Sequence, residues 1–154
     1  MPRLLVQVAP KQPADVRVSL YRYISMNATR LLFAMAFAAA LVGVLHLCAL
    51  QFFLYWRFFW FDILVHSMGG VFIALAVAWL STRSGHSVSV ALCVSVAFAL
   101  GIAWEIFEYD FNIPQTLWVS YPFDTAKDIV MDTFGGTIGA SLARRIASRD
   151  TIIP

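Results

Sequence analysis

The chain has 154 residues, of which 60% are hydrophobic and 13% are charged, and its mean hydropathy is +0.75. This composition excludes a soluble single domain of this size and predicts a polytopic membrane protein. The net charge of +2 is too small to indicate nucleic-acid binding. Cys48 and Cys93 lie in apolar runs without a C-x-x-C motif, so neither redox chemistry nor a zinc site is indicated.

Residues 1–27 have no apolar core followed by a small-residue cleavage site. We therefore expect a cytoplasmic N-terminal segment and no signal peptide. Four apolar residues in this segment share one face of a helix: Val16, Leu20, Tyr23 and Ile24. This spacing predicts a short interfacial helix, and a partner-binding arm is the alternative.

Four apolar stretches predict an all-α bundle of four transmembrane helices, because a helix needs about 20 apolar residues to cross a bilayer. The predicted spans are residues 31–50, 63–80, 88–107 and 126–143. Residues 28–147 then form one transmembrane domain, and residues 148–154 form a cytoplasmic tail. The fourth stretch has the shortest apolar part, which suits a helix that is tilted or packed against others.

Two aromatic connections join the predicted spans on one side. Residues 52–61 include eight aromatic residues in ten, a density typical of a membrane interface, and a cover over a site is the alternative. Residues 109–123 contain Pro114, Trp118 and Pro122. We expect this second connection to lie along the membrane surface, either as an aromatic anchor or as a lid over a site.

The basic residues predict the orientation of the bundle. Nine of the eleven lie on the side of the two termini and the turn near Arg83, whereas Arg57 and Lys127 lie on the other side. By the positive-inside rule, both termini are cytoplasmic and the two aromatic connections face outward. The second and fourth spans therefore run in the same direction.

Two stretches of the chain resemble each other. Residues 62–74 read DILVHSMGGVFIA and residues 128–140 read DIVMDTFGGTIGA, with five of thirteen positions identical and no gap. This likeness predicts a parallel repeat of a two-helix hairpin. Its glycine pairs predict close packing of the second span against the fourth, and chance similarity between glycine-containing helices is the alternative.

Acidic residues gather at the outward ends of the last three spans. Asp124, Asp128 and Asp132 follow at four-residue spacing, which places them in line over about 12 Å of helix. His66 lies one helical turn after Asp62 on the same face. Because ionised side chains at membrane depth cost a few kcal/mol or more, we expect these residues to share an outward-facing pocket with Glu105 and Glu108 of the third span.

Converging carboxylates repel one another, so shared protons or a bound cation must neutralise them. We hypothesise that Glu105 and Asp128 are catalytic and transfer protons. The residues hypothesised to bind a divalent metal cation are His66, Asp132, Asp62 and Glu108. Helix capping by Asp62 and Asp124 and ordinary interhelical hydrogen bonding by His46 are the structural alternatives.

The spacing of these residues resembles the motifs of the YjdF-like inner-membrane proteins, which are similar in turn to the VanZ-like family. The matching motifs are Asp62-x-x-x-His66, Trp104-Glu105-x-x-Glu108 and Asp124-x-x-x-Asp128-x-x-x-Asp132-x-x-Gly135-x-x-x-Gly139, within residues 61–143. The sequence departs from the VanZ-like pattern at Glu108, where Gln is usual, and at Asp132, where Asn is usual. The resemblance implies a small multi-pass protein of the bacterial cytoplasmic (inner) membrane without an established reaction; VanZ is associated with glycopeptide tolerance at the cell surface.

Taken together, these features predict an integral membrane protein with an outward-facing Asp/Glu/His pocket. We expect its partners to be the lipid bilayer and a lipid-linked or cell-envelope substrate, on which it acts as a metal-assisted enzyme or a binder, alone or as an oligomer. The alternatives are a component of proton or cation transport and a structural assembly protein without chemistry. Transport is disfavoured because the acids occupy only one half of the predicted spans.

Overall fold

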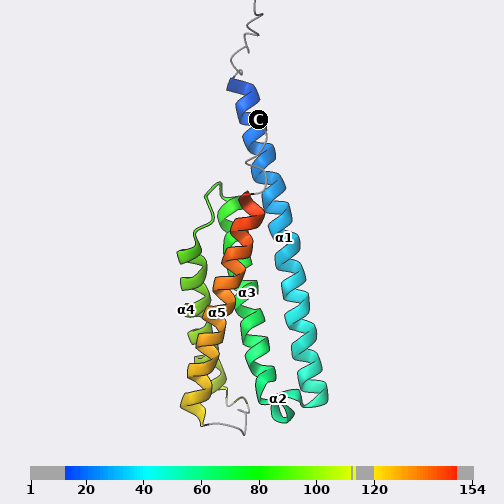
Figure 1. Cartoon of the computed structure of the whole chain (residues 1–154), viewed down its shortest axis with the longest axis vertical. Coiled ribbons are helices and arrows are strands. Elements are labelled where there is room, and N and C mark those ends of the chain that lie inside the picture. The colour runs from blue at the N-terminus through cyan, green and yellow to red at the C-terminus, as the bar shows by residue number, and fades with distance from the viewer. Residues whose placement is uncertain (1–12, 112, 114–119, 149–154) are drawn as a thin grey trace, which may run out of the picture.

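The structure is a computed structural model, and it describes residues 13–111, 113 and 120–148. These residues form helices and contain no strand, so the predicted all-α fold is confirmed for this part of the chain. The helices are α1 (Pro13–Phe52), α2 (Leu54–Arg57), α3 (Phe59–Arg83), α4 (Val90–Asp110) and α5 (Tyr121–Ser148) (Figure 1). Residues 112 and 114–119 of the connection predicted as an aromatic anchor or a lid lie outside the described residues.

The helix expected near Val16 and the first predicted span form one continuous helix, α1, which is 40 residues long. Pro13 stands in its first turn, where the missing N–H of proline costs no hydrogen bond. No further proline interrupts the helix before Phe52. The first turns of α1 extend beyond the ends of the other helices (Figure 1).

Three of the described helices are long and apolar enough to cross a membrane: Ile24–Phe52 within α1, Phe59–Arg83 and Val90–Asp110. The first two contain the predicted spans 31–50 and 63–80, and the third contains all of the predicted span 88–107 except residues 88 and 89. The fourth predicted span, residues 126–143, lies within α5, which has 28 residues but a more polar composition. That α5 crosses the membrane stays a prediction.

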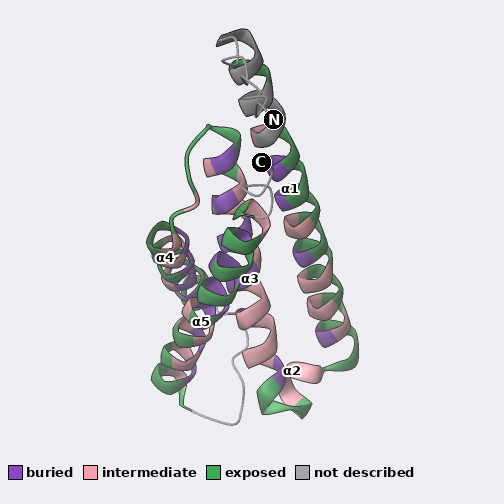
Figure 2. Ribbon diagram, turned by 45° about the horizontal axis from the view of Figure 1, so that its top comes forward, coloured by how far each residue is buried: buried purple, intermediate pink, exposed green. Residues whose placement is uncertain are grey.

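Two helices, α3 and α5, form the centre of the bundle and run parallel to each other, with α1 packed on α3 and α4 packed on both α3 and α5 (Figures 1 and 2). Helices α1 and α4 do not contact each other. The N-terminal ends of α3 and α5 lie at the same end of the bundle as α2, and the turn between α3 and α4 lies at the opposite end (Figure 1).

Glycines allow the backbones of α3 and α5 to approach closely. A Cβ atom added at Gly135 would overlap the carbonyl oxygen of Ser67, and one added at Gly70 would overlap the carbonyl oxygen of Asp132. One added at Gly139 would lie 2.7 Å from the carbonyl oxygen of Val71. The small residues of the two similar stretches therefore form the central helix contact.

An apolar core fills the part of the bundle toward the C-terminal end of α5. Its buried members come from all four long helices and are Leu31, Ala38, Val71, Ala74, Leu75, Ala78, Cys93, Ala140 and Ala143. Cys93 is buried in this core, Cys48 is half-buried on α1, and both thiols are free. Among the described residues, neither cysteine belongs to a group that could hold a metal ion.

Candidate functional site

A buried polar cluster lies between α3 and α5 at the end opposite to the apolar core. Nδ1 of His66 lies 3.2 Å from Oδ2 of Asp132. On the other edge of the imidazole, Nε2 lies 3.6 Å from Oδ1 of Asp62 and 4.0 Å from Oδ1 of Asp128. The exposed fraction of His66 is 8% and that of Asp132 is 5%. Carboxylates on both sides therefore fix the orientation of a buried ring.

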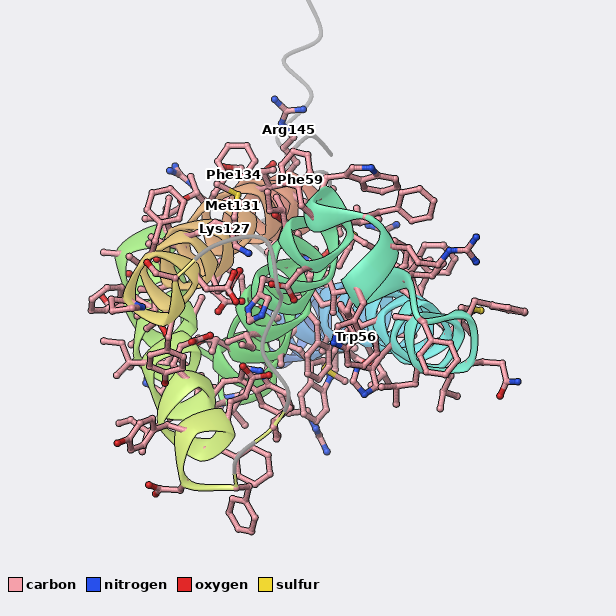
Figure 3. The ribbon with its side chains drawn as sticks, turned by 90° about the horizontal axis from the view of Figure 1, so that it is seen from below. Trp56, Phe59, Lys127, Met131, Phe134 and Arg145 are labelled. Carbon is pink, nitrogen blue, oxygen red and sulfur yellow. The ribbon has the colours of Figure 1, made fainter. Side chains whose placement is uncertain are left out.

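Lys127 of α5 supplies a positive charge to the same cluster. Its Nζ atom lies 2.6 Å from Oδ1 of Asp124, 3.0 Å from Oδ2 of Asp62 and 3.3 Å from Oδ1 of Asp128. Seen from the end of the bundle that carries α2, Lys127 points between the helices, whereas Arg145 of the same helix points outward (Figure 3). The ammonium group thus occupies the middle of three carboxylates, a role that the sequence analysis did not assign to it.

Charge in the cluster is still unbalanced. Four aspartates, Asp62, Asp124, Asp128 and Asp132, converge on it, while Lys127 and a protonated His66 would supply two positive charges at most. Like charges at this separation disfavour the ionised forms. The cluster therefore either keeps an excess of negative charge or shares protons among its carboxylates.

The hypothesised metal ligands are only partly brought together. Asp62, His66 and Asp128 each offer a ligand atom within 4.8 Å of the others. Asp132 instead binds the opposite edge of the imidazole. Glu108 accepts a hydrogen bond of 2.9 Å from the indole N–H of Trp104 and is not part of this group. The geometry thus joins Asp128, hypothesised as catalytic, to two of the four hypothesised metal ligands.

Glu105 of α4 is buried, with an exposed fraction of 3%. Neither of its carboxylate oxygens has a hydrogen-bond partner among the described residues, although Thr125 of α5 lines the same small cavity between α4 and α5. Glu105 and Asp128, hypothesised as the proton-transfer pair, both lie outside the larger groove described next. The polar residues that meet that groove are different ones.

A groove of about 650 Å³ runs along α3 between α1 and α4. Most of its lining is apolar, including Val42, Val65, Phe72, Ile73, Leu100 and Phe107. Its titratable lining residues are His46, Tyr55, Asp62, His66, Glu108, Asp124 and Asp132. The groove therefore joins apolar walls to the exposed edge of the polar cluster.

Two glycines give the groove access to Asp132, which comes from the helix behind it. Gly69 of α3 and Gly101 of α4 both line the groove. A Cβ atom at Gly101 would lie 2.7 Å from Oδ2 of Asp132, and one at Gly69 would lie 3.7 Å from Oδ1. A side chain at Gly101 would therefore take the room of the carboxylate between α3 and α4, whereas a Cβ at Gly69 would make only an ordinary contact.

Helix α2 places two aromatic side chains, Tyr55 and Trp56, on the groove. The turn into α2 depends on Phe53, whose φ of 57° is in the left-handed region that non-glycine residues rarely adopt. Tyr55 Oη lies 2.8 Å from Nδ1 of His46. His46 thus makes an interhelical hydrogen bond, as expected if its role is structural. Burial, with the nearby carboxylates of Asp62 and Glu108, raises the pKa of the Tyr55 phenol. Tyr55 therefore remains a hydrogen-bond donor at neutral pH.

The sequence offered a cover over a site as one interpretation of residues 52–61, but it did not single out Tyr55 and Trp56, because the aromatic density of this stretch is also what a membrane interface selects. Only the reversal of the chain after Phe53 turns these two rings onto the groove.

Comparison with known proteins relates the chain to a family of membrane proteins. A family model described as "Predicted membrane protein (DUF2238)" matches residues 16–149. No curated protein and no solved structure matches the chain.

Proposed function

The chain belongs to this family of predicted membrane proteins, and from that premise we propose that it binds an amphipathic cell-envelope molecule in its groove. In this proposal residues 126–143 of α5 form a fourth span, and the protein resides in the bacterial inner membrane. Both termini are cytoplasmic and the polar cluster faces outward. The asymmetry of nine basic residues against two supports this orientation.

The groove is the observation that carries the proposal. Its walls are apolar, its volume of about 650 Å³ is within the range of small-molecule sites, and its titratable residues come from α1 to α5. Because α1 and α4 do not touch, the groove lies between two helices that face lipid on their outer sides. An alkyl chain can therefore occupy the apolar part while its headgroup meets His66 and Asp132.

His66 and Asp132 are the proposed acid–base pair at the headgroup. Both line the groove, and the contact of 3.2 Å between them orients the imidazole for proton transfer. The proposal assigns the transfer to this pair because Glu105 and Asp128 do not line the groove. The proposal includes both an enzyme, which transforms the bound molecule, and a binder, which only holds it.

Lys127 reduces the need for a metal, because its ammonium group already lies among Asp62, Asp124 and Asp128. The metal-assisted alternative would use Asp62, His66 and Asp128 as ligands. Elemental analysis of detergent-purified protein, with melting curves in EDTA, Mg²⁺, Mn²⁺ and Zn²⁺, separates the two. We expect no stoichiometric metal and no cation-dependent stabilisation; either finding would restore the metal-assisted enzyme.

The alternatives from the sequence are weaker. Transport needs a polar path across the bundle, and the buried apolar core around Ala74, Cys93 and Ala140 opposes one. A purely structural cluster would have no need for a groove that reaches His66. The proposal also includes a relation of the chain to the YjdF-like and VanZ-like proteins. The family match supports this relation only in that the matched family also consists of predicted membrane proteins.

We also propose that the two similar stretches are an internal repeat. In a parallel two-fold repeat, equivalent positions of the two central helices face each other across the axis. His66 and Asp132, which occupy aligned positions, are in contact, and a Cβ at Gly70 would lie 2.8 Å from the backbone nitrogen of its aligned partner Gly136. These contacts support a duplication in which α1 with α3 corresponds to α4 with α5.

The experiment compares molecules that copurify with three forms of the protein. Gly69→Leu should fill the groove while folding, since a Cβ there makes only an ordinary contact. Gly43→Leu is the matched control, because its Cβ would meet nothing within 4 Å. Mass spectrometry of extracts should find an amphiphile enriched over bulk lipid in wild type and Gly43→Leu and absent from Gly69→Leu. Equal lipid content in all three would contradict the proposed function.

A further inference from the structure

We infer that the groove selects amphiphiles whose headgroup carries a cationic amine, an inference that rests on the proposed function. The charged lining is strongly one-sided. Four carboxylates line the groove, from Asp62, Glu108, Asp124 and Asp132, and they come from three different helices. Among the lining residues, His66 is the one basic group placed between these carboxylates.

Lys127 offsets the charge of Asp62, Asp124 and Asp128, but no ion pair joins it to Glu108 or Asp132, the other two carboxylates of the lining. It is not among the residues that line the groove, and its ammonium group is already engaged by Asp124, Asp62 and Asp128. A phosphate headgroup would therefore meet carboxylates without an available lysine or arginine, which is the opposite of a phosphate site. A headgroup ammonium would instead supply part of the missing positive charge.

The aromatic lining supports the same choice. Tyr55, Trp56, Trp104 and Phe107 line the groove together with the carboxylates. Trp104 donates its indole N–H to Glu108, and the Tyr55 phenol lies close enough to Asp62 and Glu108 for their charges to raise its pKa. Aromatic faces combined with carboxylates are a recurrent way of binding ammonium groups, because the ring quadrupole attracts cations. Phosphate gains nothing from such faces.

The test uses three probes with the same brominated 12-carbon chain and different headgroups: a primary amine, a glucoside and a phosphate. Each is titrated into protein in phosphatidylcholine nanodiscs at neutral pH and 150 mM NaCl. Binding is followed by quenching of tryptophan fluorescence, since Trp56 and Trp104 line the groove. The signal from Gly69→Leu, whose groove is filled, is subtracted as partition into bulk lipid.

We expect the amine to bind at least tenfold more tightly than the phosphate and the glucoside to bind between them. Glu108→Gln should lower the preference for the amine, and Arg57→Gln, away from the groove lining, should leave it unchanged. Equal binding of all three probes, or tighter binding of the phosphate, would overturn the amine inference while leaving the groove as a binding site. No saturable binding of any probe would overturn the proposed function itself.

Discussion

The contact between α3 and α5 has two halves with opposite chemistry. In the polar half, His66 meets Asp132, and Lys127 joins three further carboxylates. In the apolar half, Gly139 packs against Val71 and Ala74 without any polar side chain. Both halves belong to the same two parallel helices, yet small residues alone are sufficient for the second.

This difference indicates that the polar half is not needed to hold the helices together. Buried charges between helices are costly and seldom stabilise more than apolar packing of the same shape. A groove reaches His66 and Asp132, whereas the apolar half lies in the closed core. In the proposed function, a ligand accounts for the polar half, whereas folding accounts for the apolar half.

The largest expected effect comes from removing the cation of the polar half. Lys127→Met should destabilise the protein by about 3–5 kcal/mol, because the buried Asp124 and Asp128 and the half-buried Asp62 lose their partner. Arg145→Met is the control, since Arg145 is exposed on the same helix, and its effect should stay within about 0.5 kcal/mol. Thermal unfolding in detergent measures both. Equal losses for the two variants would mean that Lys127 is not a structural part of the cluster.

The next effect tests packing in the shared contact. Gly135→Ala should cost about 1–3 kcal/mol, because the added Cβ overlaps the Ser67 carbonyl oxygen and α3 must shift. Gly43→Ala, which meets nothing within 4 Å, should be neutral or slightly stabilising because alanine favours the helix. Denaturation curves of the two variants give the comparison. A tolerated Gly135→Ala would contradict the close approach of α3 and α5.

Coupling within the polar half should be of intermediate size. His66→Gln and Asp132→Asn remove the two ends of one direct contact, so their effects on stability should be non-additive by about 0.5–3 kcal/mol. Combining Asp132→Asn with Ala143→Gly, in the apolar half, should be additive within about 0.5 kcal/mol. The three single and two double variants can be compared by thermal unfolding. If the effects of the first pair were additive, His66 and Asp132 would contribute to stability independently of each other.

The smallest effect is expected at Glu105. Its buried carboxylate has no hydrogen-bond partner among the described residues, and Glu105→Gln replaces it with an amide of the same shape that cannot ionise. We expect a gain on the order of 1 kcal/mol in thermal unfolding. Glu108→Gln is the comparison. We expect it to gain less stability, because the Glu108 carboxylate already accepts a hydrogen bond from the Trp104 indole. A marked loss at Glu105 would indicate a partner that stabilises the ionised carboxylate.

Much of this arrangement could be predicted from local spacing. The four-residue intervals of Asp124, Asp128 and Asp132 fix one face of a helix, and the glycine pairs of the two similar stretches indicate where that helix meets its neighbour. Contact of His66 with Asp132 follows from that register. Local periodicity was sufficient here because α3 and α5 present their small residues and their acids to each other.

The remainder depends on tertiary structure. Lys127 shares a helix with Asp124 and Asp128, but its third carboxylate, Asp62, is 65 residues away, and no local pattern assigns the lysine to it. The groove likewise depends on α1 and α4 lying on separate sides of α3 without touching, which helix periodicity does not determine. For the same reason, the sequence grouped Glu105 with residues of the groove, whereas Glu105 faces a different cavity with Thr125.

The chain offers a direct spectroscopic test of ligand binding at the polar half. Its three histidines lie in different places: His66 at the polar end of the groove, His46 hydrogen-bonded to Tyr55 on the groove wall, and His86 exposed in the turn between α3 and α4. NMR of histidine-labelled protein can follow all three imidazoles during titration with the 12-carbon amine. We predict saturable shifts of the His66 and His46 signals with no shift of His86. Saturable binding that leaves His66 unchanged would contradict the central claim that the ligand headgroup meets the His66–Asp132 pair.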